Sequence, residues 1–588
     1  MAVLELAMAR VLALMLFAAF AQVVLTVAVM GSGLGALVAS LRPARGARGR
    51  AAAAVAFGVL GWGAVALVAR VPWTRPGAVE DYAQRTIVAW DLVDFGVMAW
   101  ALPMLAIPYA VAGWVVSSAL MDGTATGPRV AADRFGFGLA AAFAGLWVAV
   151  IPPPDQGALT CALAGVAAAL WSRTALSWAA LGAGGVGVSA AAAGVGLTLS
   201  GLAGVPDEHV VWTRWTPLAR LALHEGPERT IVMLDNTSAS EVVRTQATLD
   251  RLARDAPARS LVYELGPPPG PTAILAAGAG PEVAVAQVWG VRDIEAIDLA
   301  DGIGAMLAER YPHDALNPWR VPGVRAVVGD GRRAVAGGRY GAIQLVHANL
   351  HSASGLLAAA WSPALLTTRE GFGELLDALA PDGVLSVASG PLTMRLGPSL
   401  AAALAARGCD PVEACVAGIG GTQPTLLARP RAWTEAEGVA LRRAVGRHHG
   451  HKIEWGGPDL VVGTRWLGAA VATDDRPFVD PPATVMAAAL EGLRGLGPGT
   501  PLPAYALGWR AWWVATGAVG LGALVAFAVA SKRGPRDRRG AWAASSIGAV
   551  AAGQAVVFGV RFVGYGATLG LVGLGFFGVA WLSRRPRV

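Results

Sequence analysis

Charged residues are distributed unevenly along this chain of 588 residues, and that distribution limits what the chain can fold into. Only 15% of all residues are charged, whereas soluble domains carry about 25%. Residues 1–205 and 508–583 are poor in charge, but residues 206–505 have an ordinary soluble composition. A membrane-crossing helix needs about 20 apolar residues in succession. The sequence therefore predicts two membrane-embedded regions that flank one soluble region.

Apolar runs of the length of a membrane span occur in both outer regions. By the length rule they number about nine. They comprise 20–41, 51–70, 93–119, 134–151, 156–172 and 175–203, then 508–530 and a hairpin within 541–583. Residues 2–19 are also apolar but include Glu5 and Arg10, so they form either a short extra span or an interfacial helix. No small-residue cleavage site precedes a polar stretch, which argues against a cleavable signal peptide.

Short basic segments beside the apolar runs indicate the orientation in the membrane, because cytoplasmic loops carry an excess of Lys and Arg. Such residues follow the first predicted span and the span at 508–530: Arg42, Arg45, Arg48, Arg50, Lys532, Arg533, Arg536, Arg538 and Arg539. An even number of predicted spans separates the two basic loops, and one span separates the soluble region from the second loop. We therefore expect an integral protein of a bacterial inner membrane, with its soluble region on the non-cytoplasmic side.

Residues 273–298 have the pattern of a nucleotide-binding βαβ unit. An apolar run ends in Gly278-Ala279-Gly280, a helical segment follows, and a second apolar run ends on Asp298. Glycines in such a turn let the backbone approach a ligand, and an acid about 20 residues later can bind ribose hydroxyls. Val283 stands where the dinucleotide fingerprint has its third glycine, so an ordinary strand-to-helix turn remains the alternative.

Alternating strands and helices continue beyond this unit. Predicted strands are Ala273–Ala277, the run ending at Asp298, Val324–Val328, Ala342–Val346 and Val384–Ala388, with a helix near Glu370–Leu379. This alternation predicts a parallel sheet whose ligands lie at the carboxyl ends of the strands. The segment within residues 219–243 is predicted to form a β hairpin.

The predicted organisation is a polytopic α-helical membrane protein with an inserted α/β Rossmann-like domain of methyltransferase type. Its four parts are 1–205 (transmembrane helices), 206–270 (a small β-rich lead-in), 271–505 (the Rossmann-like domain) and 506–588 (C-terminal transmembrane helices). We expect the lipid bilayer as a partner, and possible nucleoside, polyamine or membrane-protein partners. No basic patch alternates with aromatic residues in 206–505, which argues against nucleic-acid binding.

Five segments, in order, carry a resemblance to a known family: ILAAGAGPEV, IEAIDL, VVGDGRRAV, YGAIQL and LAPDGVLSV. They resemble the spermidine synthase (aminopropyltransferase) family, and more closely its membrane-fused branch. Further matches are LELAMAR, ADRFGFGLAA, LVYEL and ATDDRPF, so that the resemblance extends over nearly the whole chain. It implies the fold shared by polyamine aminopropyltransferases and S-adenosylmethionine-dependent methyltransferases.

The resemblance also implies which residues would bind a ligand. Gly278 and Gly280, together with Glu282, would line the nucleoside and tail of S-adenosylmethionine or its decarboxylated form. Asp298 would accept hydrogen bonds from the ribose hydroxyls. Asp330 would lie beside the adenine amino group.

The catalytic acids that the resemblance implies after the fourth strand are missing from this chain. Relatives have Tyr-Asp, an apolar strand and then acidic residues, whereas this chain has Tyr340-Gly341 and later His347-Ala348-Asn349-Leu350-His351. Carboxylates would hold the cationic polyamine and accept its proton. His347 or His351 has a pKa suited to a general base, but an imidazole holds a polycation poorly. The two histidines are therefore candidate catalytic residues, and loop histidines near a degenerate pocket are the favoured interpretation.

The predicted location of the soluble region outside the cytoplasm also argues for a degenerate site. S-adenosylmethionine is made in the cytosol, so an outward-facing domain would lack it. The favoured function is ligand binding or membrane-complex assembly by a divergent member with a degenerate catalytic site. One alternative is an active aminopropyltransferase or another S-adenosylmethionine-dependent transferase. The other is a transporter or sensor with a regulatory nucleoside-binding domain.

Three further groups of residues have competing interpretations. Cys409 and Cys415 would be able to pair outside the cytoplasm, but one lies in a turn and the other in a predicted strand, which favours free thiols. The histidines within 448–451 suit a basic solvated turn better than a metal site, and we predict no metal. The segment 474–478 (DDRPF) is either a ligand-facing loop or, the interpretation we favour, a strut that holds the domain to the membrane.

Overall fold

The computed structural model describes most of the chain up to residue 475. The described ranges are 1–15, 18–44, 46–73, 95–121, 135–136, 138–140, 142–143, 150–197, 199, 207–216, 219–234, 238–255, 257–314, 316–346, 365–389, 393–409, 412–420, 424–456 and 471–475. His347 and His351, the predicted spans beyond residue 508 and half of the one at 134–151 lie outside these ranges.

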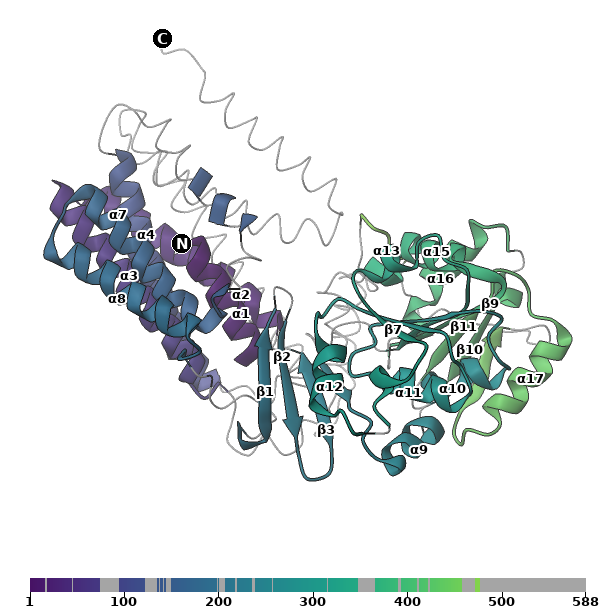
Figure 1. Ribbon diagram of the computed structural model, residues 1–588. Helices are drawn as coiled ribbons and strands as arrows, with labels where there is room; N and C mark the ends of the chain where they lie inside the picture. Colours follow the sequence, from purple (N-terminus) through teal and green to yellow (C-terminus); the bar gives the residue numbers. More distant parts are fainter. Residues whose placement is uncertain are drawn as a thin grey trace, which may run out of the picture.

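The N-terminal helices pack together as one bundle (Figure 1). They are α1 (Ala2–Met15), α2 (Ala18–Leu41), α3 (Gly46–Arg70), α4 (Phe95–Met121), α7 (Gln156–Trp171) and α8 (Ala175–Ala192), with the 3-10 turn η1 (Pro153–Asp155). Glycines sit where backbones meet: a Cβ on Gly35 or Gly113 would collide with the backbone of the facing helix. Small residues of this kind let membrane helices approach closely.

Three of these helices are long and apolar enough to cross a membrane, judged by length and composition: Gly46–Arg70, Trp100–Leu120 and Ala175–Ala192. They coincide with the predicted spans at 51–70, 93–119 and 175–203. Helix α1 has 14 residues, and its Leu4, Met8 and Leu12 are buried in the bundle core. The polytopic arrangement and the side on which the soluble region lies stay predictions.

A small antiparallel sheet follows the bundle and lies between the bundle and the α/β domain (Figure 1). The 3-10 turn η2 (Asp207–His209) leads into β1 (Val210–Trp215), β2 (Arg220–Glu225), β3 (Thr230–Leu234) and β4 (Ser238–Glu241), paired in chain order. The predicted hairpin is confirmed, because β2 pairs antiparallel with β3 from Leu221↔Leu234 to Glu225↔Thr230. Trp215 packs against the core of the bundle.

The α/β domain is built on an eight-stranded sheet in the order β12-β10-β11-β9-β8-β5-β6-β7. Its strands are β5 (Thr272–Leu275), β6 (Ile294–Asp298), β7 (Val324–Val328), β8 (Tyr340–Val346), β9 (Leu379–Ala388), β10 (Val416–Gly420), β11 (Thr425–Ala428) and β12 (Lys452–Gly456). Strands β5 to β9 pair in parallel, whereas β11 is antiparallel to both β9 and β10. The chain order reverses beside β5, which is the switch point of a Rossmann-like sheet. The predicted methyltransferase-type α/β fold is thus confirmed.

Helices cover both faces of this sheet. They are α9 (Gln246–Asp255), α10 (Pro257–Glu264), α11 (Pro281–Val288), α12 (Ile303–Arg310), α13 (Gly331–Val335), α15 (Arg369–Asp377), α16 (Gly397–Ala405) and α17 (Glu435–Val445). The 3-10 turns are η3 (Pro318–Arg320), η4 (Leu365–Thr367), η5 (Thr393–Leu396) and η6 (Val412–Cys415).

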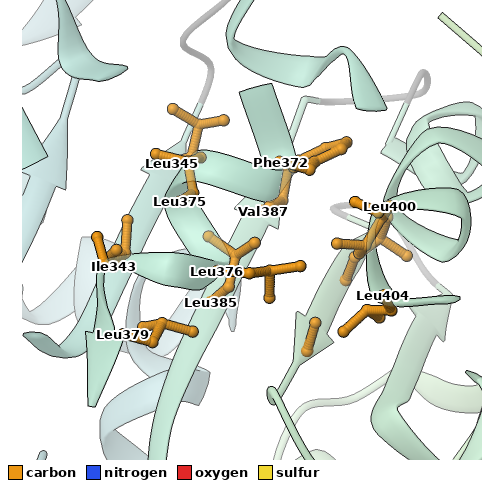
Figure 2. Packing of buried hydrophobic residues seen from close by; sticks show 14 of the residues in the cluster. Ile343, Leu345, Phe372, Leu375, Leu376, Leu379, Leu385, Val387, Leu400 and Leu404 are labelled. Carbon is orange, nitrogen blue, oxygen red and sulfur yellow. The ribbon is translucent and has the colours of Figure 1, made fainter. Parts of the chain in front are cut away.

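The central strand β8 is buried along its whole length, as expected for a strand covered on both faces. On one face Ile343 and Leu345 pack with Leu385, Phe372 and Leu400 from β9, α15 and α16, as Figure 2 shows. On the other face the Gln344 amide accepts a hydrogen bond from the Tyr263 hydroxyl at 2.9 Å. The central strand is therefore held from both faces of the sheet.

Cys409 and Cys415 form a disulfide, which corrects the expectation of free thiols. Helix α16 ends at Ala405, and the turn through Gly408 brings the chain back beside the start of β10. The two Cα atoms are consequently 6.7 Å apart, within the range that a disulfide spans. Cys415 ends the 3-10 turn η6, one residue before β10, and not the strand that the sequence predicted.

The histidine cluster also differs in part from the prediction. The side chain of His448 is buried, with Nε2 lying 2.7 Å from Glu264 Oε1, while His449 is exposed as expected for a solvated turn. Glu264 belongs to α10, far from the cluster in the sequence, so sequence spacing does not reveal it. In the described part of the chain, no group of three or more His, Cys, Asp or Glu residues is placed to hold a metal ion.

Candidate ligand site at the carboxyl edge of the sheet

The glycine turn, residues 276–280, connects the end of β5 to the start of α11. Ala276, Gly278 and Gly280 have φ angles of 56°, 52° and 89°, in the left-handed region that glycine adopts without steric cost. Ala276 is the one described non-glycine residue with positive φ. Such a residue is held by its surroundings at a cost of about 1–3 kcal/mol, and strain of this kind clusters at functional sites.

Two consecutive amides of the turn are held by side chains from different parts of the molecule. Gly278 N donates to Asp298 Oδ2 at 2.8 Å, and Ala279 N donates to Ser240 Oγ at 2.9 Å. Asp298 ends the neighbouring strand β6, whereas Ser240 comes from β4 of the small sheet. The turn is thereby fixed in one conformation without any ligand.

Asp298 is oriented entirely by backbone amides. Its Oδ1 accepts a hydrogen bond from Ala300 N at 2.7 Å. Burial raises the pKa of the Asp298 carboxyl, and the amides of Ala300, Gly278 and Leu299 act in the opposite direction. A carboxylate offers about four lone-pair positions, so one acceptor position remains for a ligand hydroxyl.

Two exposed aliphatic residues are neighbours of Asp298, one across the sheet and one along the chain, and sequence reasoning missed both. Val328 is the register partner of Asp298 in the sheet, so their side chains leave the same face. Val328 is 59% exposed, and Leu299, the residue after Asp298, is 47% exposed. Their position directly at the ends of β6 and β7 was the available signal, but an apolar residue there is indistinguishable by pattern from a core residue.

The structure brings three of the predicted ligand residues together, namely Gly278, Gly280 and Asp298. Asp330 lies at the end of the next strand, where its Oδ1 caps α13 by accepting from Arg333 N at 3.2 Å. Glu282 is 5% exposed, and its Oε1 pairs with Arg259 Nε of α10 at 2.8 Å. Ligand binding by all five residues stays a prediction.

Trp319 of η3 is a second residue that the sequence did not single out. Its indole lies against Gly280 and Gly304: an added Cβ would approach it within 3.1 Å and 2.8 Å, respectively. Its Nε1 donates to Ala279 O at 3.0 Å. Only glycine at these two positions leaves room for the ring. Trp319 therefore packs against the glycine turn and supports it through the hydrogen bond to Ala279.

The segment 471–475 docks beside the same edge. Asp474 Oδ1 accepts from Arg332 Nη1 at 2.9 Å and from Thr368 Oγ1 at 2.7 Å. Arg332 also forms an ion pair with Glu374, and its hydrogen bond lowers the pKa of the Glu374 carboxyl. These contacts are to groups of the α/β domain itself. The strut and the ligand-facing loop both stay predictions, and Arg476 to Phe478 lie outside the described residues.

Comparison with known proteins was made for the whole chain. No family model and no curated protein matches it. Among solved structures it is similar to spermidine synthase from Thermotoga maritima, with 14% identity, a TM-score of 0.28, and coverage of 41% of this chain and 78% of that one. It is similar to a spermidine synthase in complex with the transition-state analogue AdoDATO, with 15% identity, a TM-score of 0.28, and coverage of 41% of this chain and 78% of that one. It is also similar to human methyltransferase-like protein 13 in complex with SAH, with 14% identity, a TM-score of 0.22, and coverage of 34% of this chain and 88% of that one. This weak, partial likeness concerns the fold alone.

Proposed function

We propose that the α/β domain binds an adenosyl nucleoside at the carboxyl edge of its sheet. The chain would be a ligand-binding member of the membrane-fused spermidine synthase-like family whose aminopropyl-transfer chemistry is degenerate. The observation that carries the proposal is the Asp298 carboxylate, which is bound by amides of the glycine turn and of its own turn. An exposed aliphatic residue follows it in the chain, and another is its register partner on β7.

The ribose part of the proposal rests on Asp298. In Rossmann-like sheets an acid at the end of the second strand accepts hydrogen bonds from ribose hydroxyls. Asp298 has this position, and its partners among the described residues are amides rather than arginines. Its negative charge is therefore available to a ligand.

The base part rests on Leu299 and Val328. Ligand sites are lined mainly by apolar side chains with a few placed polar groups. Two aliphatic side chains exposed beside Asp298 suit the faces of a flat aromatic base. Asp330, the cap of α13, lies two residues after Val328, where the resemblance puts the group that meets the adenine amine.

Loss of transfer chemistry is argued from the sequence after β8. Residues 347–364 contain no Asp or Glu, so this segment cannot supply a carboxylate to hold and deprotonate a polyamine, wherever it lies. His347 and His351 are retained as candidate bases. Turnover of decarboxylated S-adenosylmethionine with putrescine, lost on replacing both histidines, would contradict the degenerate-site part of the proposal.

The membrane setting is part of the same proposal. Three candidate spans support integration into a bilayer, and a disulfide between Cys409 and Cys415 suits an oxidising compartment. External protease should therefore cleave the 206–475 region in intact spheroplasts and leave it intact in inverted vesicles. The reverse pattern would place the domain in the cytoplasm.

Ligand-dependent thermal unfolding of the full-length protein in detergent tests nucleoside binding. A ligand at 100 times its dissociation constant adds about 2.7 kcal/mol of stability. We expect adenosyl compounds to raise the unfolding temperature of the wild type and of Asp301→Asn, a matched exposed acid. Asp298→Asn and Val328→Asp should lose this rise in unfolding temperature. Val328 is exposed, so Val328→Asp should leave the fold intact. A cooperative unfolding transition that no adenosyl compound moves would refute the proposal.

A further inference from the structure

Ser240 brings the small sheet into contact with the proposed nucleoside site. Its Oγ accepts a hydrogen bond from Ala279 N at 2.9 Å, and a Cβ added to Gly278 would lie 2.7 Å from that oxygen. Since Gly278 N is bound to Asp298, Ser240 and Asp298 flank the same turn. When a Rossmann-like acid holds the ribose, the 5′ substituent of the nucleoside lies over the glycine turn. Ser240 therefore borders the position of the 5′ substituent.

The glycine turn itself offers no charge to a 5′ substituent. Residues 276–281 read Ala-Ala-Gly-Ala-Gly-Pro. The first acid of the following helix, Glu282, is buried and paired with Arg259. The side chain that does meet the turn from the small sheet is the uncharged hydroxyl of Ser240.

Other acids that the structure describes near this edge are already bound to protein groups. Asp330 accepts from Arg333 N as a helix cap, Asp474 is bound by Arg332 and Thr368, and Asp301 pairs with Arg214. The segment 347–364 contains no Asp, Glu, Lys or Arg. Asp298 is thus the one acid among the described residues of the turn's surroundings that is held by amides alone, and the ribose uses it.

An unpaired cation would be disfavoured at such a turn. Removing a charge from water without a partner costs several kcal/mol. A thioether carries almost no such cost, and a hydroxyl carries little once it is hydrogen-bonded. Accepting from Ala279 leaves the Ser240 hydroxyl hydrogen to donate to an acceptor on the ligand.

We propose that this site selects adenine nucleosides whose 5′ substituent is uncharged, and that Ser240 is the residue that sets this selectivity. The ligand class is a 5′-hydroxyl or 5′-thioether nucleoside, in contrast to a sulfonium compound with an ammonium tail. This inference rests on the proposed nucleoside site and names its ligand class.

A ligand series of increasing positive charge tests the inference by calorimetry on the full-length protein in detergent. The probes are 5′-methylthioadenosine, which is neutral, S-adenosylmethionine, whose sulfonium and ammonium are partly balanced by a carboxylate, and its decarboxylated form, which keeps both cations and lacks the carboxylate. We expect the dissociation constant of the neutral thioether to be at least about tenfold lower than that of the decarboxylated compound.

Replacing Ser240 provides the matched test. Ser240→Asp keeps an acceptor for Ala279 N–H and adds a carboxylate beside the 5′ position, so it should improve binding of the decarboxylated compound relative to the neutral thioether by about tenfold. Ser240→Asn, similar in shape but uncharged, should leave that ratio unchanged.

The outcomes separate the two proposals. Wild-type protein that binds the decarboxylated compound as tightly as the neutral thioether overturns the selectivity and leaves nucleoside binding standing. A Ser240→Asp protein that folds and binds but keeps the wild-type ratio removes Ser240 from its role. Failure of every adenosyl compound to bind overturns the proposed function together with the inference.

Discussion

Two acids on neighbouring elements of the α/β domain, one buried and one half-buried, are satisfied in different ways. Glu282, on α11, is paired with the Arg259 guanidinium of α10. Asp298, at the end of β6, is held by backbone amides of its own turn and of the glycine turn. An arginine neutralises the first acid and ties two helices together. Amides orient the second but leave its charge uncompensated, which distinguishes a group placed for a ligand from one placed for stability.

The same contrast holds elsewhere in the domain. Glu264 is bound by Arg447 and His448, and Glu437 is bound by Arg431, which is the main reason that the pKa of Glu437 falls to about 2. These groups tie helix ends to neighbouring elements. Asp298 differs, because burial raises its pKa and no cationic side chain among its described partners lowers it.

The largest expected effect comes from breaking the Glu282–Arg259 pair. Glu282→Gln leaves the Arg259 charge largely buried, and removal of one partner of a buried pair costs about 3–5 kcal/mol. Urea unfolding should show this loss, while Glu309→Gln, at an exposed position, should be close to neutral. Adenosyl binding measured under native conditions should persist in Glu282→Gln. Loss of binding with little loss of stability would reverse the roles given to Glu282 and Asp298.

An intermediate effect is expected from His224 of β2, a buried base whose ring nitrogens have no hydrogen-bond partner among the described residues. Burial, with Arg220 and His209, lowers its pKa to about 4. Because the unfolded chain binds a proton near pH 6.5 and the folded protein does not, stability should decline as pH falls from about 6.5 to about 4, by about 3 kcal/mol.

The measurement for His224 is the unfolding temperature as a function of pH. His224→Met should flatten the decline in that interval, and His449→Gln, which changes an exposed histidine, should retain it. An unchanged profile in His224→Met would show that another group produces the acid sensitivity.

The smallest effect on stability, but the largest on binding, is expected for Asp298→Asn. The amide loses part of its acceptor capacity for Gly278 and Ala300, which costs about 1–2 kcal/mol. Removal of the charge at the same time relieves the cost of burying it at neutral pH. Since the folded pKa is raised, the wild type should gain relative to Asp298→Asn as pH falls through that pKa. Paired unfolding curves at pH 7 and pH 4 check the sign.

The local sequence predicted several elements well. Strand β7 coincides with the predicted Val324–Val328, and β6 ends at Asp298 as expected. Apolar runs bounded by glycine and acidic residues carry this information, because a strand covered on both faces must be apolar throughout. The β8 strand begins earlier than predicted, at Tyr340 rather than Ala342. The first two residues of β8, Tyr340 and Gly341, do not show the apolar pattern that marks the start of a strand.

Contacts between distant segments were beyond the reach of pattern reasoning. Ser240 meets the glycine turn across 39 residues, and Trp319 reaches Ala279 across 40. Glu264 meets His448 across 184. No local pattern predicts these partners, since what each residue contacts depends on how the helices and the small sheet pack.

The sequence by itself determined the alternation of apolar strands and helices, the charge-poor segments, the glycine turn with its acid 20 residues later, and the missing acids after β8. These properties follow from residue type and local spacing, which set backbone conformation and the burial of each face. Only the tertiary structure decided which acids are neutralised by arginines, which cysteines are joined, and which hydroxyl borders the turn. The reason is that such partners are selected by proximity in space, and proximity arises when separate elements bury their apolar faces against each other.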